Sequence, residues 1–300
     1  MRLPNENAPR PFDRALWRAR RGRAATTLET ADFLLDETVE SFAERLAAVT
    51  RRFGRAAVIG AGTGKAAAML GERFGIGTVL QLDASPAMAT RARRGAPDAP
   101  VLVADEEALP LAPASLDLIV APLTLHWTND LPGTLIQMRR ALRPDGLFMA
   151  ALFAGETLRE LRACLAEAEI ETAGGLSPRI APMADLRDLG GLLQRAGLAL
   201  PVADTDTHVV RYGSFADLVA DLRRMGATYA NPHPGRRATF ARAAALYAER
   251  FSDPDGRLRA TFEHVSLSGW APHPSQQKPL RPGSAKARLA EALGTTETKA

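Results

Sequence analysis

A glycine-rich turn is the first feature of this sequence whose residue types suit the binding of a cofactor. In "RAAVIGAGTGKAAAML", an apolar run leads into Gly60, Gly62 and Gly64, and helix-forming residues follow. Glycines let a backbone approach a ligand closely, and the first N–H groups of the following helix have no partners within it. A G-x-G-x-x-G dinucleotide loop would need glycine in place of Lys65, and a P-loop would need Ser or Thr in place of Ala66. The spacing therefore favours a cofactor held without phosphate contacts, and an ordinary structural turn is the alternative.

Acidic residues end the next two apolar runs along the chain. Asp83 ends "GTVLQLD", 19 residues after Gly64, and Asp105 ends "VLVAD" and precedes Glu106. The carboxyl ends of parallel strands meet at one edge of a sheet, where an acid after the second strand binds the ribose hydroxyls of an adenosine group. The alternative for Asp83 is a helix cap, although Ser85 already suits that role. Asp105 faces either the adenine amino group or solvent. Together the three consecutive strand ends indicate an adenosine-containing cofactor.

Apolar periodicity predicts the elements that bring these residues together. In the first half of the chain, short strands alternate with helices, which is the pattern of a parallel sheet covered on both faces. The expected strands are 56–60, 77–83, 101–104 and 116–121, with a further strand in "RPDGLFMAALF". After residue 155 the expected helices are 156–172, 184–196, 214–225 and 236–250, and long strands at 200–212 and 260–272 would close the sheet. We therefore divide the chain into a basic segment and helix (1–50), a cofactor-binding core (51–155), a helical insertion with closing strands (156–285) and a disordered tail (286–300).

Composition narrows the class of protein. The 300 residues are 46% hydrophobic and 24% charged, which is ordinary for a soluble globular protein. No apolar run approaches the roughly 20 residues that span a bilayer, and no secretory signal is visible. The single cysteine, Cys164, rules out a disulfide framework and fits a reducing compartment. Because arginine greatly outnumbers lysine, we expect a bacterial cytoplasmic protein.

The N-terminus carries most of the positive charge. Residues 1–23 contain seven arginines and two acidic residues. The first interpretation is a solvated helix, and the second is electrostatic contact with an acidic partner or the inner face of a membrane. The sequence leaves both open.

The order of these motifs resembles class I S-adenosylmethionine-dependent methyltransferases. The resemblance rests on the glycine loop, Asp83 and "ADEEALPLAPASLDLIVAPLTLHWTNDLPGTLIQMRRALRPDG". More narrowly, the chain resembles the branch that contains the biotin-pathway malonyl-carrier methyltransferases and the mitochondrial complex I assembly factor 5 proteins. The stretches "FDRALWRARRGRAA", "GETLRELRACLAEAE", "GGLSPRIAPMADLRDLGGLLQRAG" and "GWAPHPSQQKPLRPGSA" carry that narrower resemblance, which covers roughly residues 11–290.

The resemblance implies a Rossmann-like fold with a mainly parallel seven-stranded sheet, and S-adenosylmethionine as the cofactor, with no metal. Glycines 60, 62 and 64 would line its methionine and ribose portion, Asp83 would hold the ribose, and Asp105 and Glu106 would lie near the adenine. The full set of cofactor-binding residues implied is Gly60, Ala61, Gly62, Thr63, Gly64, Asp83, Ala84, Met88, Asp105, Glu106 and Leu125.

Val58 departs from this family's pattern. Many relatives carry aspartate at this position, in "DLGxGxG", where it helps to fix the loop and the amino group of the cofactor. Its loss removes about one hydrogen bond, or roughly tenfold in affinity for about 1.4 kcal/mol. We therefore expect a real cofactor pocket with reduced affinity.

His126 and Trp127 are the candidate catalytic residues, because the resemblance places them on the methyl-transfer side. Methyl transfer depends on alignment and desolvation, so a base is not required. His126 is interpreted either as a base or substrate donor, or as a structural histidine held by Asn129 or Asp130. Trp127 either stacks on substrate or packs in the core. The fourth strand ends in "APLTLHW" and lacks an Asn-Pro-Pro-Tyr motif, which argues against a nucleic-acid substrate.

The functional prediction is a methyltransferase-family protein that acts on a protein substrate, a subunit of respiratory complex I, during assembly of that complex. Three alternatives stay open. The first is an arginine hydroxylase of a complex I subunit, although the five histidines include no His-x-Asp/Glu pair for an iron site. The second is a methyltransferase of a small acid or a carrier-bound acyl group. The third is a cofactor-binding chaperone without catalysis.

The C-terminal stretch "SGWAPHPSQQKPLRPGSA" (268–285) is rich in proline and should stay extended. Such a segment could cover the cofactor as a lid, dock a partner protein, or form part of a disordered tail. The family resemblance extends into this stretch and favours a lid or docking segment.

Overall fold

A seven-stranded sheet forms the centre of the computed structural model, which describes residues 10–230 and 235–277. The strand order is β3-β2-β1-β4-β5-β7-β6. Strands β1 to β5 are parallel where they pair, and β7 lies antiparallel between β5 and β6. The bounds are β1 (Arg55–Ile59), β2 (Thr78–Asp83), β3 (Val101–Val103), β4 (Leu116–Pro122), β5 (Leu142–Phe153), β6 (Ala199–Tyr212) and β7 (Leu258–Trp270). The predicted Rossmann-like, mainly parallel sheet is confirmed.

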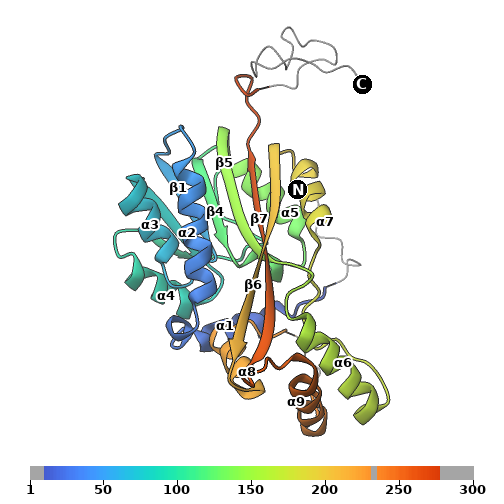
Figure 1. Ribbon diagram of the computed structural model, residues 1–300. Coiled ribbons are helices and arrows are strands. Elements are labelled where there is room, and N and C mark those ends of the chain that lie inside the picture. Colours follow the sequence, from blue (N-terminus) through green and yellow to red (C-terminus); the bar gives the residue numbers. More distant parts are fainter. Residues whose placement is uncertain (1–9, 231–234, 278–300) are drawn as a thin grey trace, which may run out of the picture.

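Helices cover both faces of the sheet and one of its edges (Figure 1). They are α1 (Arg14–Ala24), α2 (Phe33–Ala47), α3 (Lys65–Phe74), α4 (Pro86–Gly95), α5 (Leu131–Ala141), α6 (Arg159–Ala173), α7 (Leu186–Arg195), α8 (Phe215–Arg224) and α9 (Arg237–Phe251). Short 3₁₀ turns occur at η1 (Leu28–Thr30) and η2 (Leu125–Trp127). None of the helices in the described residues is long and apolar enough to cross a membrane.

The sheet lies between two layers of helices, and the alternating side chains of β1 pack against both. Ala57 and Ile59 pack in the core under α5 and α7, whereas Ala56 and Val58 pack under α2, α3 and α4. Successive residues of a strand point to opposite faces, so a short apolar run is buried on both sides. A separate apolar cluster joins α6, α8 and α9 to the far ends of β5, β6 and β7. Val58 is fully buried and has a packing role in this chain.

The direction of β7 corrects the expectation for the C-terminal stretch. Trp270 pairs with Leu147 near the start of β5, whereas the carboxyl end of β5, Phe153, pairs with His264. The chain therefore leaves β7 at the edge opposite to the carboxyl ends of the parallel strands, and Ala271 donates its N–H to the carbonyl of Gly146. A lid over the cofactor is wrong for residues 271–277. Residues 278–285 and the tail 286–300 lie outside the described residues.

Candidate cofactor and methyl-transfer site

The glycine loop turns sharply at the carboxyl end of β1. Gly60, Gly62 and Gly64 have φ values of +72°, +56° and +86°, a region in which side chains other than hydrogen are strained. The N–H groups of Gly60 and Ala61 donate to the carbonyl of Leu82 at 2.8 and 2.9 Å, which ties the loop to β2. A Cβ on Gly60 would lie 2.4 Å from Thr124, and one on Gly64 would lie 2.5 Å from the carbonyl oxygen of Ala92. Two of the three glycines are therefore required by packing alone.

Asp83 is held directly against this loop. Its carboxylate is 1% exposed, and Oδ2 accepts the N–H of Gly62 at 3.1 Å. The other oxygen, Oδ1, accepts the N–H of Ser85 at 2.9 Å, and Ser85 caps α4 as expected. The guanidinium of Arg21 approaches Oδ2 at 3.4 Å. The structure thus brings Asp83 and the glycine loop together, as the sequence predicts, and adds a basic partner from α1.

Three further residues of the predicted set, Thr63, Ala84 and Met88, are buried. Ala84 follows Asp83 and packs in the apolar cluster of Trp17 and Trp127. Met88 packs against α1 and the turn after it. The hydroxyl of Thr63 is buried and has no hydrogen-bond partner among the described residues.

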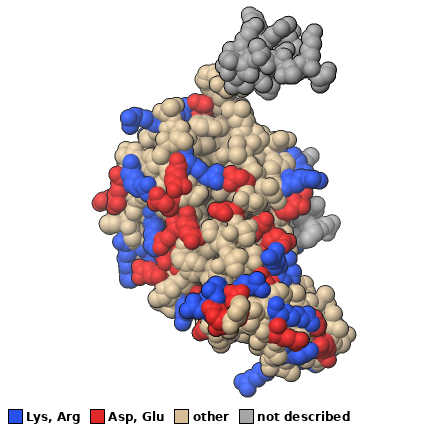
Figure 2. Space-filling view, in the orientation of Figure 1, with Lys and Arg blue, Asp and Glu red and all other residues tan. Residues whose placement is uncertain are grey.

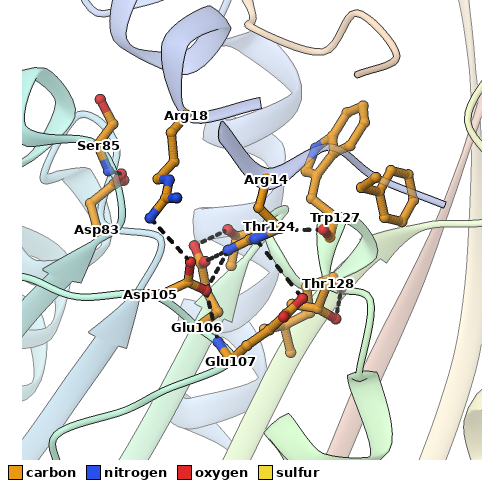
Figure 3. A network of polar contacts seen from close by, with 12 residues as sticks. Arg14, Arg18, Asp83, Ser85, Asp105, Glu106, Glu107, Thr124, Trp127 and Thr128 are labelled. Carbon is orange, nitrogen blue, oxygen red and sulfur yellow. Dashed lines mark hydrogen bonds and ion pairs between the residues drawn. The ribbon is translucent and has the colours of Figure 1, made fainter. Parts of the chain in front are cut away.

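Asp105 and Glu106 are also paired with α1 (Figure 3). Arg14 Nη2 lies 2.7 Å from Asp105 Oδ1 and forms an ion pair with Glu106 as well. Arg18 Nη1 approaches Asp105 Oδ2 at 3.6 Å, and the hydroxyl of Thr124 donates to Glu106 Oε1 at 3.1 Å. Burial raises the pKa of Glu106, and the guanidinium of Arg14 opposes that shift. Glu106 therefore serves as an anchor for α1 in this arrangement.

The contacts of these arginines with acids of the same chain were not predicted from the sequence. Arg14, Arg18 and Arg21 lie four and three residues apart, so they share one face of α1. The side chains of Arg14 and Arg21 are 11% and 12% exposed, because they point toward acids of the same chain. A fully solvated basic helix is therefore wrong for these two residues. The signal that could have identified them is their helical spacing, matched to acids at the ends of two strands.

The surface of the molecule also shows basic side chains next to acidic ones. On the face drawn in Figure 2, basic and acidic side chains are interspersed over α1, α2 and the neighbouring helices. That face has no broad field of a single sign, which an electrostatic docking surface would present.

Leu125, His126 and Trp127 form the turn η2 after β4. Leu125 is fully buried in the core. The ring of His126 lies 5.0 Å from that of Phe153 and 5.3 Å from that of Trp127, measured between centroids. Neither ring nitrogen has a hydrogen-bond partner among the described residues. Burial, with a smaller effect of Arg21, lowers the pKa of His126 to about 3.

The interpretation of His126 as a histidine held by Asn129 or Asp130 is wrong. The side chain of Asn129 instead accepts the N–H of Phe12 at 3.0 Å and donates to its carbonyl at 3.2 Å. Asp130 caps α5 by accepting the N–H of Gly133. Trp127 packs edge-on to Phe12 at 5.4 Å, and its carbonyl accepts Arg14 Nη1 at 3.0 Å.

A small cavity of about 50 Å³ separates the glycine loop from η2 and α1. Gly60, Arg21, His126, Trp127 and Phe153 are among the residues that line it. Pockets for small ligands usually measure about 300–1,000 Å³, so α1 closes this edge of the sheet more tightly than a nucleoside-sized ligand allows.

The residues present nevertheless fit S-adenosylmethionine. A buried carboxylate stands beside the glycine loop, and a carboxylate can accept further hydrogen bonds from ribose hydroxyls. The unpartnered Thr63 hydroxyl and His126 ring offer additional polar atoms. Within residues 10–230 and 235–277, no group of three or more His, Cys, Asp or Glu side chains is arranged to hold a metal ion.

Comparison with known proteins agrees with the fold. Residues 57–150 match the methyltransferase domain family. The chain is 39% identical to human "Arginine-hydroxylase NDUFAF5, mitochondrial", over 93% of this chain and 82% of that protein. It is 35% identical to malonyl-[acyl-carrier protein] O-methyltransferase of Laribacter hongkongensis, over 90% of this chain and 94% of that protein. A solved phosphoethanolamine N-methyltransferase 2 of Haemonchus contortus, in complex with S-adenosylhomocysteine, has a similar fold. Its TM-score is 0.55 at 14% identity, covering 86% of this chain and 60% of that one.

Proposed function

This chain belongs to the S-adenosylmethionine-dependent methyltransferase family that includes NDUFAF5 and malonyl-[acyl-carrier protein] O-methyltransferase, and we propose that it binds S-adenosylmethionine. We further propose that it modifies a protein substrate during assembly of respiratory complex I. In a bacterium this work would be done in the cytoplasm, at the inner face of the membrane. The observation that carries cofactor binding is the buried carboxylate of Asp83 beside Gly62.

The cofactor residues are proposed on that basis. Asp83 would accept the ribose hydroxyls, and the backbone of Gly60, Ala61, Gly62, Thr63 and Gly64 would lie along the methionine portion. Ala84, Met88 and Leu125 would supply apolar walls, since all three are buried next to the site. Asp105 and Glu106 would border the adenine once Arg14 moves away from them.

When bound, the cofactor supplies a methyl group on a positively charged sulfur. What the chain must supply is alignment and exclusion of water. His126 and Trp127 are proposed to border the transfer site, because both line the small cavity. With a pKa of about 3, His126 is neutral near pH 7 and too weakly basic for efficient general-base catalysis. Its proposed role is to orient a substrate group through a hydrogen bond.

Arginine hydroxylation is the second candidate. It is supported by similarity over 93% of this chain to relatives named arginine-hydroxylase. The two reactions differ in product mass, because methylation adds about 14 Da and oxygen insertion adds about 16 Da to the substrate.

The test is a deletion strain in which complex I activity and the masses of complex I subunit peptides are both measured. Complementation with the wild-type gene should restore activity and one mass shift, and the Asp83→Asn variant should restore neither. Unchanged complex I activity together with unchanged peptide masses in the deletion strain would contradict the assembly role. A small-molecule substrate would then be the better account.

A further inference from the structure

A second and much larger cavity lies on the other side of α1 from the small cavity next to Gly60 and His126. Its volume is about 710 Å³, and its walls come from α1, α6, α8, residues 178–183 and 227–229, and Phe240 of α9. Figure 1 shows α1, α6 and α8 together at one end of the molecule. This volume is within the usual range of small-ligand pockets.

A close contact between α1 and the end of α8 separates the two cavities. Gly226 has φ +70°, and a Cβ there would lie 3.2 Å from the Cβ of Ala24 and 3.4 Å from the Cα of Arg21. Ala227 borders both spaces, whereas Arg21 lines the smaller cavity and Arg20 and Arg23 line the larger one. The larger cavity is therefore a separate compartment from the cofactor loop.

Arginines gather in the lining of this larger cavity. Its described lining residues include five arginines, 20, 23, 179, 223 and 224, and no aspartate or glutamate. Arg179 pairs with Glu169 and Arg224 with Asp221, but the guanidinium groups of Arg23 and Arg223 have no ion pair or hydrogen bond within the described residues. Burial and repulsion from Arg23 lower the pKa of Arg20, which donates to the carbonyl of Tyr229. Arginines without an acidic partner bind anionic groups, above all a carboxylate or a phosphate.

Apolar side chains form the rest of the wall. Ile180, Met183, Phe215 and Val219 are half-buried in this lining, and Phe240 of α9 is 40% exposed. A free inorganic anion would leave this apolar surface uncovered. The ligand that satisfies both halves carries a negative head and an unbranched hydrocarbon chain.

We propose that the cavity between α1, α6 and α8 is a binding site for a single-chain fatty carboxylate, separate from the methyl-transfer site. The carboxylate lies among Arg20, Arg23 and Arg223, and the chain lies against Phe215, Val219 and Phe240. A cationic guest such as a substrate guanidinium is repelled here. This site does not depend on cofactor binding, so it can be tested independently of the proposed function.

Calorimetric titration of the full chain with octanoate and decanoate tests the proposal. Each buried methylene should improve affinity about fourfold, so decanoate should bind about fifteenfold more tightly than octanoate. Decyltrimethylammonium, with the same chain and opposite charge, should not bind. Equal binding of the two decyl compounds would overturn the proposal, and so would uptake of anionic phospholipid vesicles in the absence of decanoate binding.

Two variants locate the site. The double variant Arg23→Glu/Arg223→Glu should weaken decanoate binding at least tenfold, and Val219→Trp should also weaken it, because the indole would occupy the part of the cavity next to α8. The matched control is Arg93→Glu/Arg195→Glu, since each of these exposed arginines also lies in the last turn of its helix without a partner among the described residues. Thermal unfolding of all variants checks that they fold. Decanoate affinity that is unchanged in folded Arg23→Glu/Arg223→Glu and Val219→Trp would overturn the assignment.

Discussion

At the scale of single residues, the ion pair of Arg14 with Glu106 is the most consequential contact at the cofactor edge. The side chain of Glu106 is 1% exposed, and Arg14 also contacts Asp105. Arg14→Gln leaves a buried carboxylate without its cation, so we expect the free energy of unfolding to fall by about 3 kcal/mol. Urea denaturation measures this loss.

Arg18→Gln is the matched control for that change. Arg18 is 45% exposed and lies 3.6 Å from Asp105, so its loss should cost less than about 0.5 kcal/mol. Adding Glu106→Gln to Arg14→Gln should recover part of the stability, because the unpaired charge disappears. Equal effects of Arg14→Gln and Arg18→Gln would show that the buried pair does not stabilise the helix.

The buried ring of His126 should make the free energy of unfolding depend on pH. Its pKa is lowered to about 3 in the folded chain, from an ordinary value near 6.5. Below pH 6.5 the unfolded chain binds a proton that the folded chain does not, so stability falls as the pH falls. At pH 5 this effect should cost about 2 kcal/mol relative to pH 7. His126→Phe should remove that part of the loss in urea denaturation, whereas substitution of the exposed His273 should not. If the stability of the wild type and of His126→Phe depended on pH in the same way, this prediction would be wrong.

At the scale of elements, α1 covers the edge of the sheet where the cofactor site is proposed. Its arginines occupy the acids at the ends of β2 and β3, and the space beneath is about 50 Å³. We therefore predict that α1 must loosen before S-adenosylmethionine can enter. If Arg14→Gln weakens the closed arrangement by about 1.4 kcal/mol, association of S-adenosylmethionine should become about tenfold faster, whereas Arg18→Gln should have little effect. Stopped-flow tryptophan fluorescence, with Trp17 and Trp127 adjacent to the site, measures the rate. An unchanged rate in Arg14→Gln would show that α1 does not gate entry.

The elements themselves could be predicted because local patterns determine them. Apolar runs placed β1, β2 and β4 to within a residue or two, and Ser85 followed by Pro86 marked the start of α4. The inward orientation of α1 could not be predicted, because a basic helix facing solvent has the same sequence pattern as one facing buried acids. The position of Trp270 depended on the direction of β7, which pairing with β5 determines and local sequence does not.

At the scale of the whole molecule, α1 separates two compartments of different character. The smaller compartment is lined by residues that include Gly60 and His126, and the larger one is lined by arginines and apolar side chains. Similarity to NDUFAF5 over 93% of the chain includes the helices α6 and α8 that form the larger compartment. The proposed cofactor site therefore lies in the first half of the chain, and the second half supplies most of the walls of the larger cavity.

Binding of S-adenosylmethionine to the full chain tests the proposed cofactor site. Calorimetry should give saturable binding for the wild type, and ligand at 100 times its dissociation constant should stabilise the fold by about 2.7 kcal/mol. Asp83→Asn removes the negative charge and should weaken binding roughly tenfold to a hundredfold, from a loss of about 1.5–3 kcal/mol. The control is Asp98→Ala, an exposed acid outside the site. We expect the wild type and Asp98→Ala to bind S-adenosylmethionine and Asp83→Asn to bind it weakly. If the wild type does not bind at millimolar ligand, or if all three proteins bind equally, the proposed cofactor site is wrong.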